Sequence, residues 1–291
     1  MTITSQPFYL LNMSNATPTW QNTTLNDYLY TDGNIPAGWE DFFNDAKTKS
    51  AIAEISKGLT EALSKTATLD PPLHKVFKAF ELSPLDKTKA VIVGQDPAPE
   101  PGLAQGISFS IPSSKNTKHV PSIQRILLEA QNEGINVDIY DGNLTPWAEE
   151  GVLLLNETLT ISCTEESCTP DSNLQYWTPF LPLLIDFLNA YNKPLVYILW
   201  GEKAQQNKPL IKGSNHKVLT GGHPSPKADG KYFFCGRYFL NANDFLKENG
   251  VAEIDWTLSD KPKKDYGAWG WGWDSKEEKS YEQEKCTGSD R

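Results

Sequence analysis

Four short apolar stretches alternate with helical patterns along this chain, and this alternation constrains the fold more than any other feature. The stretches are AVIVG, GVLLLN, PLVYILWG and KVLTGG, at residues 90–94, 151–156, 194–201 and 217–222. Apolar residues at helical spacing occur before or between them, at 50–66, 121–134 and 178–192. Strands joined through helices lie parallel and are covered on both faces. We therefore expect an α/β fold with a central parallel four-stranded sheet flanked by helices.

The two ends of the chain differ in composition from the region 37–257, which carries this pattern. Residues 1–36 are rich in Asn, Thr and Ser, which predicts a loosely structured N-terminal arm. Residues 258–291 form a polar tail with alternating Gly and Trp, whose tryptophans we expect to pack on the domain or on a protein partner. No stretch reaches the ~18 uninterrupted apolar residues of a membrane span, and no basic segment typical of a secretory signal begins the chain. These features predict an intracellular protein, in nucleus or cytoplasm, that does not bind a membrane.

Net charge and cysteine content limit the kinds of binding and metal chemistry that we expect of this chain. A formal net charge of −10 argues against a protein coated in basic residues for non-specific DNA binding, although it allows a local basic face. The four cysteines match no zinc or iron–sulfur spacing, so they indicate no metal site. They are predicted to be free thiols in a reducing compartment, with a small-loop disulfide between Cys163 and Cys168 as the alternative.

Polar side chains follow the predicted strands where each strand ends. The first strand leads into Gln95 and Asp96, the second ends at Asn156, and the last runs into the turn that holds His223. Ligands of parallel α/β sheets bind beyond the carboxyl ends of the strands. We therefore expect a carboxylate, an amide and an imidazole to meet in one crevice. Each residue alone also fits an ordinary structural role, in a turn or as a partner of nearby backbone.

Several of these groups suit a planar ligand attached to a phosphate. The amide of Asn156 offers one donor and one acceptor, which is what the NH–C=O edge of uracil requires. Phe109 can stack on a planar ring or fill the core. Ser122 stands at the start of a predicted helix, where it suits a phosphate contact or a helix cap. Ser225 can donate to a phosphate as well.

Taken in order, the motifs resemble those of the family-1 uracil-DNA glycosylases. GQDPAP followed by AQGISFS stands where that family has GQDPYH and AxGxxFS. The family's serine before a helix corresponds to VPS at 120–122. Two predicted strand segments also match the family pattern, GVLLLNETLT at 151–160 and ILWGEKAQ at 198–205. The family's HPSP is intact at 223–226, and it is followed by YFFCGRYF at 232–239 and IDW at 254–256. The similarity runs from about residue 70 to 256. The chain therefore resembles a divergent member of this family.

The resemblance implies hydrolysis of the N-glycosidic bond of a flipped deoxyuridine in DNA, as in base-excision repair, by a monomer without cofactors. It implies that Asp96 positions the attacking water and stabilises charge on the sugar, and that a neutral His223 donates to uracil O2 beside Gln95. Phe109 would stack on the base, and Asn156 would bind its O4 and N3–H edge.

Further residues are implied in contacts with single- or double-stranded DNA. Four would hold the DNA backbone around the extruded nucleotide: Pro121, Ser122, Ser225 and Pro226. Three basic residues would contact the DNA near the gap left by the base: Lys227, Lys231 and Arg237. Lys227 stands where the family has a leucine that enters this gap, and its basic neighbours predict salt-dependent binding.

The family motif is changed beside the base. Ala98 and Pro99 replace a Tyr and a His, and the family's Tyr excludes thymine by bulk at C5 of uracil. An open wall at Ala98 favours a second hypothesis, excision of a 5-substituted pyrimidine such as thymine or 5-hydroxymethyluracil, unless Leu103 fills the space. A third hypothesis is a non-catalytic DNA-binding or replication scaffold. The retained Asp96, Asn156 and His223 argue against it, because a scaffold needs none of them.

Overall fold

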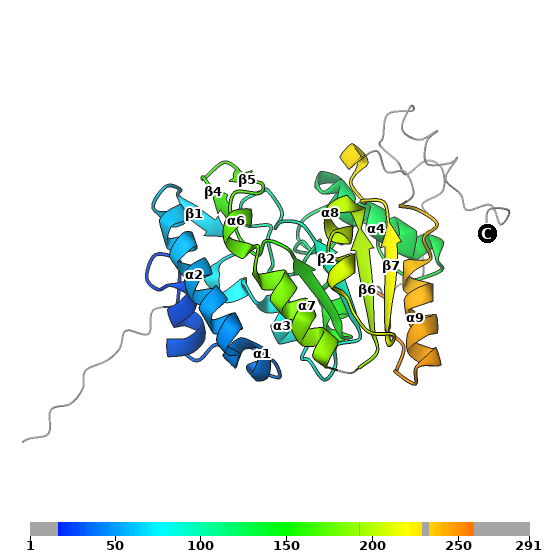
Figure 1. The fold of residues 1–291 in the computed structure, drawn as a ribbon. Coiled ribbons are helices and arrows are strands. Elements are labelled where there is room, and N and C mark those ends of the chain that lie inside the picture. Colours follow the sequence, from blue (N-terminus) through cyan, green and yellow to red (C-terminus); the bar gives the residue numbers. More distant parts are fainter. Residues whose placement is uncertain (1–16, 192, 229–232, 259–291) are drawn as a thin grey trace, which may run out of the picture.

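A parallel sheet of four strands forms the centre of the computed structural model, which describes residues 17–191, 193–228 and 233–258 (Figure 1). The strand order is β3-β2-β6-β7, and every neighbouring pair is parallel. The strands are β2 (Ala90–Gly94), β3 (Val152–Asn156), β6 (Leu195–Trp200) and β7 (His216–Gly221). The expected α/β fold is confirmed, with each strand beginning and ending within one residue of its predicted stretch.

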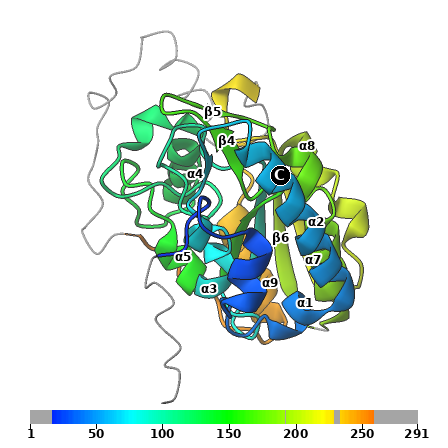
Figure 2. The same ribbon diagram turned by 90° about the vertical axis from the view of Figure 1, so that its left-hand side faces the viewer.

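Helices cover both faces of this sheet. Val91 and Val93 of β2 belong to a core shared with α2 (Ala46–Leu63) and α7 (Phe180–Ala190). Ile92 points the other way, into a core shared with the two helices α4 (Pro121–Asn132) and α9 (Tyr238–Glu248). Figure 2 shows α4 and α7 on opposite sides of β6. Burial on both faces explains why β2, β3 and β6 are continuous apolar runs, whereas the edge strand β7 is only partly buried and contains polar residues.

Shorter helices connect these layers. They are η1 (Asp27–Thr31), α1 (Glu40–Asn44), η2 (Leu73–Lys75), α3 (Lys78–Leu82), η3 (Thr117–His119), α5 (Thr145–Glu149), α6 (Leu174–Trp177), α8 (Gly201–Gln205), η4 (Lys208–Leu210) and η5 (Pro226–Ala228). Over the residues that the structure describes, no helix combines the length and apolar character needed to cross a bilayer.

Part of the predicted N-terminal arm belongs to the core, which corrects the expectation of a loose segment up to residue 36. Leu25 and Leu29 are 1% and 0% exposed, and the indole of Trp20 donates to the carbonyl of Pro71 at 2.9 Å. The apolar side chains of this segment recur at helical spacing and so share one buried face. Residues 1–16 and most of the Trp-rich tail, 259–291, lie outside the described residues.

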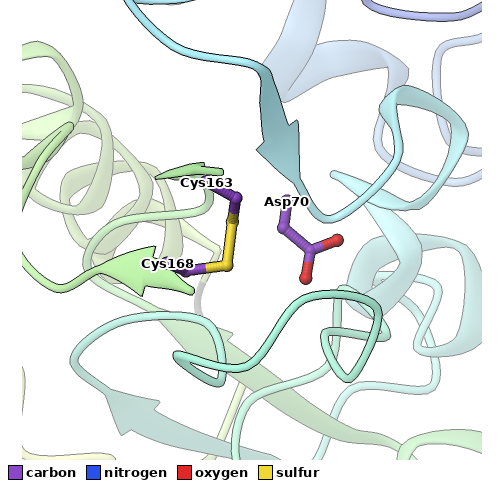
Figure 3. Close-up of side chains that lie close together, drawn as sticks. All are labelled: Asp70, Cys163 and Cys168. Carbon is purple, nitrogen blue, oxygen red and sulfur yellow. A yellow bond between two sulfur atoms is a disulfide. The ribbon is translucent and has the colours of Figure 1, made fainter. Parts of the chain in front are cut away.

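A second, antiparallel sheet was not predicted. It has the order β1-β4-β5 and consists of β1 (Thr68–Asp70), β4 (Ile161–Cys163) and β5 (Cys168–Thr169). Cys163 and Cys168 pair across β4 and β5 and form a disulfide (Figure 3). The prediction of free thiols is therefore wrong for these two residues, because the hairpin brings their Cα atoms to 4.0 Å.

The disulfide lies beside Asp70 at the end of β1, as Figure 3 shows. The carboxylate and the two sulfur atoms lie within 4.8 Å of one another, a spacing that metal ligands share. In the disulfide the sulfurs are bonded to each other and offer no thiolate. The Asp70 carboxylate instead accepts a hydrogen bond from the backbone of Gly102 at 3.2 Å, which ties β1 to the loop after β2.

Candidate active site

A cavity of about 410 Å³ opens at the carboxyl edge of the central sheet. Nine of the predicted site residues line it: Gln95, Asp96, Ala98, Phe109, Ser122, Asn156, His223, Ser225 and Lys227. The strands explain this convergence. Gln95 follows β2, Asn156 ends β3 and His223 follows β7, and parallel strands present their carboxyl ends at one edge.

The other predicted residues that the structure describes, Pro121, Pro226 and Arg237, are not part of this cavity lining. Pro121 begins α4 beside Ser122, and Pro226 is exposed at the start of η5. Arg237 is exposed at the N-terminus of α9 with φ 50°. Lys231 lies outside the described residues.

Asp96 has one engaged and one unengaged carboxylate oxygen. Its Oδ2 accepts hydrogen bonds from the side chain of Gln95 and the backbone N–H of Asp171, both at 3.2 Å. Its Oδ1 is buried, and no residue that the structure describes donates to it. Burial raises the pKa of Asp96 to about 6, and the nearby Asp171 charge adds to the rise. The group is therefore mostly ionised at neutral pH, with one oxygen available to a ligand or water.

His223 is arranged as a neutral donor. Its Nδ1 accepts a hydrogen bond from the backbone N–H of Ser225 at 3.0 Å. The proton of the neutral ring therefore sits on Nε2. Burial lowers the pKa of His223, and the charge of Lys203 lowers it further. Both effects keep the imidazole uncharged at neutral pH.

Phe109 and Asn156 occupy constrained positions in the wall of the cavity. Phe109 has a φ of 62°, a region that bulky residues rarely adopt, and its ring lies edge-on to Trp200 with centroids 5.8 Å apart. Asn156 is only 8% exposed. Gly94, on the neighbouring strand, leaves room for it, since a Cβ at that position would lie 2.4 Å from the Asn156 amide oxygen.

Two residues that the sequence did not single out bear on Asp96. Asp171 follows β5, and its carboxylate accepts from the side chain of Gln95 at 2.8 Å. Lys203 of α8 forms an ion pair with Asp171 at 3.2 Å. Pro-Asp-Ser at 170–172 has the composition of an ordinary turn, so no local pattern indicates a site there. Only the path of the β4–β5 hairpin brings Asp171 to Asp96.

Known proteins resemble the chain in sequence and in fold. The family model described as "Uracil DNA glycosylase superfamily" matches residues 80–247, more than half of the chain. A uracil-DNA glycosylase of Lactococcus lactis is 42% identical, over 64% of this chain and 83% of its own length. That of Dictyostelium discoideum is 36% identical, over 82% of this chain and 69% of its own length. The fold is also that of the crystal structure of mimivirus uracil-DNA glycosylase, with a TM-score of 0.66 at 24% identity over 80% of this chain and 93% of the other. With this family match and these relatives, the chain belongs to the uracil-DNA glycosylase superfamily.

Proposed function

We propose that this protein is a uracil-DNA glycosylase that hydrolyses the N-glycosidic bond of a deoxyuridine flipped out of DNA. The observation that carries the proposal is the shared cavity, lined by the carboxylate of Asp96, the neutral imidazole of His223 and the amide of Asn156. Its relatives bear the name of this enzyme, which supports the same reaction here.

The proposed chemistry separates two charges. As the bond between C1′ of the sugar and N1 of uracil breaks, positive charge grows on the sugar and negative charge on the base. Asp96 stabilises the first and orients a water whose oxygen bonds to C1′ while its proton passes through the Asp96 carboxylate to solvent. The uracil anion takes up a proton from solvent after it leaves. His223 donates from Nε2 toward uracil O2 and stabilises the second. Fixed charges and dipoles in a water-poor cavity are effective at this task because they need no reorganisation.

A neutral imidazole suffices on the side of the leaving group. Ordinary glycosidases protonate a poor leaving group with a second carboxylic acid. The uracil anion is a better leaving group, so a hydrogen bond to O2 replaces full protonation. The hydrogen bond from Ser225 to Nδ1 supports this role, since it leaves Nε2 as the donor.

The base is recognised by its ring face and its polar edge. Phe109 stacks on the ring, and Asn156 pairs with O4 and N3–H, while Gln95 lies beside O2. The DNA backbone is held outside the cavity by Ser122 and Ser225. Pro121, Pro226, Lys227 and Arg237 extend that contact surface. The protein acts on single- or double-stranded DNA as a monomer, with the C-terminal tail available to a protein partner.

The direct test is the identity of the base released from defined oligonucleotides. The full chain is incubated with DNA carrying one uracil, single-stranded or opposite A or G, and the free base is identified by mass spectrometry. Release of uracil supports the proposal. Tight binding of the same DNA without any base release would instead favour the scaffold hypothesis.

A second candidate substrate class is favoured by the wall around Ala98. Ala98 lines the cavity beside Pro97 and Pro99, whereas Leu103, which is 2% exposed, is not among the residues that line it. The absence of Leu103 from the lining favours an open wall over the alternative in which Leu103 fills the space left by the family's Tyr. An alanine at this position leaves room for a substituent at C5 of the pyrimidine.

We expect the wild type to release thymine or 5-hydroxymethyluracil as well as uracil, and the Ala98→Tyr variant to lose the larger bases selectively. A clash with one small substituent changes discrimination by roughly 10- to 100-fold. The measurement is the ratio of single-turnover rates on matched oligonucleotides, with Ala98→Ser as the small-residue control. Strict uracil preference in the wild type, unchanged by tyrosine, contradicts the open wall.

A further inference from the structure

The hairpin formed by β4 and β5 reaches the loop that carries Asp96. Its two strands are joined by the disulfide between Cys163 and Cys168, and the backbone N–H of Cys168 donates to the carbonyl of Pro99 at 3.4 Å. Pro170, two residues after Cys168, lines the cavity. The hairpin is thus hydrogen-bonded to the loop that carries Asp96, and the residue after Pro170 is Asp171.

Asp171 contacts Asp96 in two ways. Its backbone N–H donates directly to Oδ2 of Asp96 at 3.2 Å. Its carboxylate accepts from Nε2 of Gln95 at 2.8 Å, and the same Nε2 also donates to Oδ2 of Asp96. The φ of Asp171 is 57°, a conformation that aspartate tolerates better than most residues, and this conformation accompanies the inward N–H.

We propose, on the basis of the glycosylase function above, that Asp171 is a positioning residue that acts through Asp96. Its backbone N–H and the Gln95 side chain that it holds engage Oδ2 of Asp96, which leaves Oδ1 for the water and the sugar. Its charge, balanced by the ion pair with Lys203, sets the electrostatic field at the Asp96 carboxylate.

Four charged or titratable groups from different elements lie around the cavity or interact with one another near it. Asp171 comes from the hairpin and Glu157 follows β3, while Lys203 lies on α8 and His223 follows β7. Burial opposes ionisation of Asp171, but hydrogen bonds from Gln95 and Lys203 hold its pKa below the usual value. Asp171 is therefore anionic at neutral pH and disfavours the anionic form of Asp96.

The experiment compares pH profiles of single-turnover uracil release by the full chain at saturating enzyme. Asp171→Asn keeps the shape and an acceptor for Gln95 but removes the charge, so the acid limb of the profile moves to lower pH. Asp171→Gly keeps the N–H and adopts the positive φ freely, but it offers Gln95 no acceptor. It shows the same shift with a plateau about three- to tenfold lower, the effect of one lost hydrogen bond.

Two further variants separate this role from a structural one. Lys203→Gln moves the acid limb to higher pH for two reasons. The negative charge of Asp171 is no longer balanced, and the charge of Lys203 no longer opposes protonation of His223. Asp186→Asn, the same substitution at an exposed site on α7, leaves the profile unchanged. The ion pair is exposed and contributes little to folding, so all four variants keep the wild-type unfolding temperature.

The outcomes distinguish this inference from the function on which it rests. A wild-type protein that releases no uracil overturns the proposed function and the inference together. The role of Asp171 alone is overturned if the wild type releases uracil and both Asp171 variants have the same pH midpoint and the same plateau rate as the wild type. Opposite shifts in the Asp171 and Lys203 variants support it.

Discussion

The Asp96→Asn variant is expected to release uracil about 10²- to 10³-fold more slowly than the wild type, the usual effect of removing one preorganised group that stabilises transition-state charge. The amide keeps the shape of the carboxylate and can still accept from Gln95 and Asp171. It carries no charge to oppose the positive sugar. The loss should therefore appear in the single-turnover rate, with little change in affinity for uracil-containing DNA.

The pH dependence of the wild type provides an independent check on Asp96. Only its ionised form stabilises the sugar, and burial raises its pKa to about 6. The wild-type rate should therefore fall as the pH decreases through about 6, while the residual rate of Asp96→Asn lacks this limb. A variant that retains the wild-type rate and pH profile would show that Asp96 is not the group that stabilises the sugar.

The raised pKa of Asp96 also makes the folding stability depend on pH. The folded state holds the proton of Asp96 more tightly than the unfolded chain, whose carboxyl titrates at about 4. The contribution of this group to folding is therefore most favourable at low pH, and it declines as the pH rises from about 4 through about 6. Above that window the buried charge costs stability, so Asp96→Asn should unfold at the same or a higher temperature than the wild type at neutral pH. Greater stability with less activity is typical of a functional site.

The central sheet and the meeting of Asp96, Asn156 and His223 were predictable because both follow from local patterns. Continuous apolar runs mark strands buried on both faces, and parallel strands direct their carboxyl ends to one edge. The residue types at those ends then indicated the chemistry. Ala98, in the loop that follows β2, was found in the cavity wall for the same reason.

What the sequence did not reveal depends on contacts between distant segments. The strand β1 pairs with β4, more than 90 residues later along the chain, and each is only three residues long, which leaves almost no periodicity to detect. The contact between Asp171 and Asp96 follows from that pairing and from the hairpin. The spacing of Cys163 and Cys168 fitted a disulfide or free thiols equally well until the hairpin was known.

The second large effect is expected at His223, where His223→Leu should slow uracil release by about 10²-fold or more, because the growing charge on uracil O2 loses its donor. His223→Gln retains an amide donor on a side chain of similar length, so it should recover part of this loss. Rates that decrease from the wild type to His223→Gln and then to His223→Leu indicate a hydrogen bond donated by a neutral group. A loss shared equally by both variants would indicate a requirement for the imidazole ring itself.

His216 supplies the matched control. It is a second half-buried histidine, it begins β7 just upstream of His223, and burial lowers its pKa too, but it does not line the cavity. His216→Gln should therefore leave the rate of uracil release unchanged. The protonation state can be read directly from the ¹⁵N resonances of the two rings, and His223 should be neutral with its proton on Nε2 at pH 7, as the bond from Ser225 to Nδ1 requires. If His223 is instead found as an imidazolium in the free enzyme, donation by a neutral ring is wrong, and charge neutralisation of the departing base takes its place.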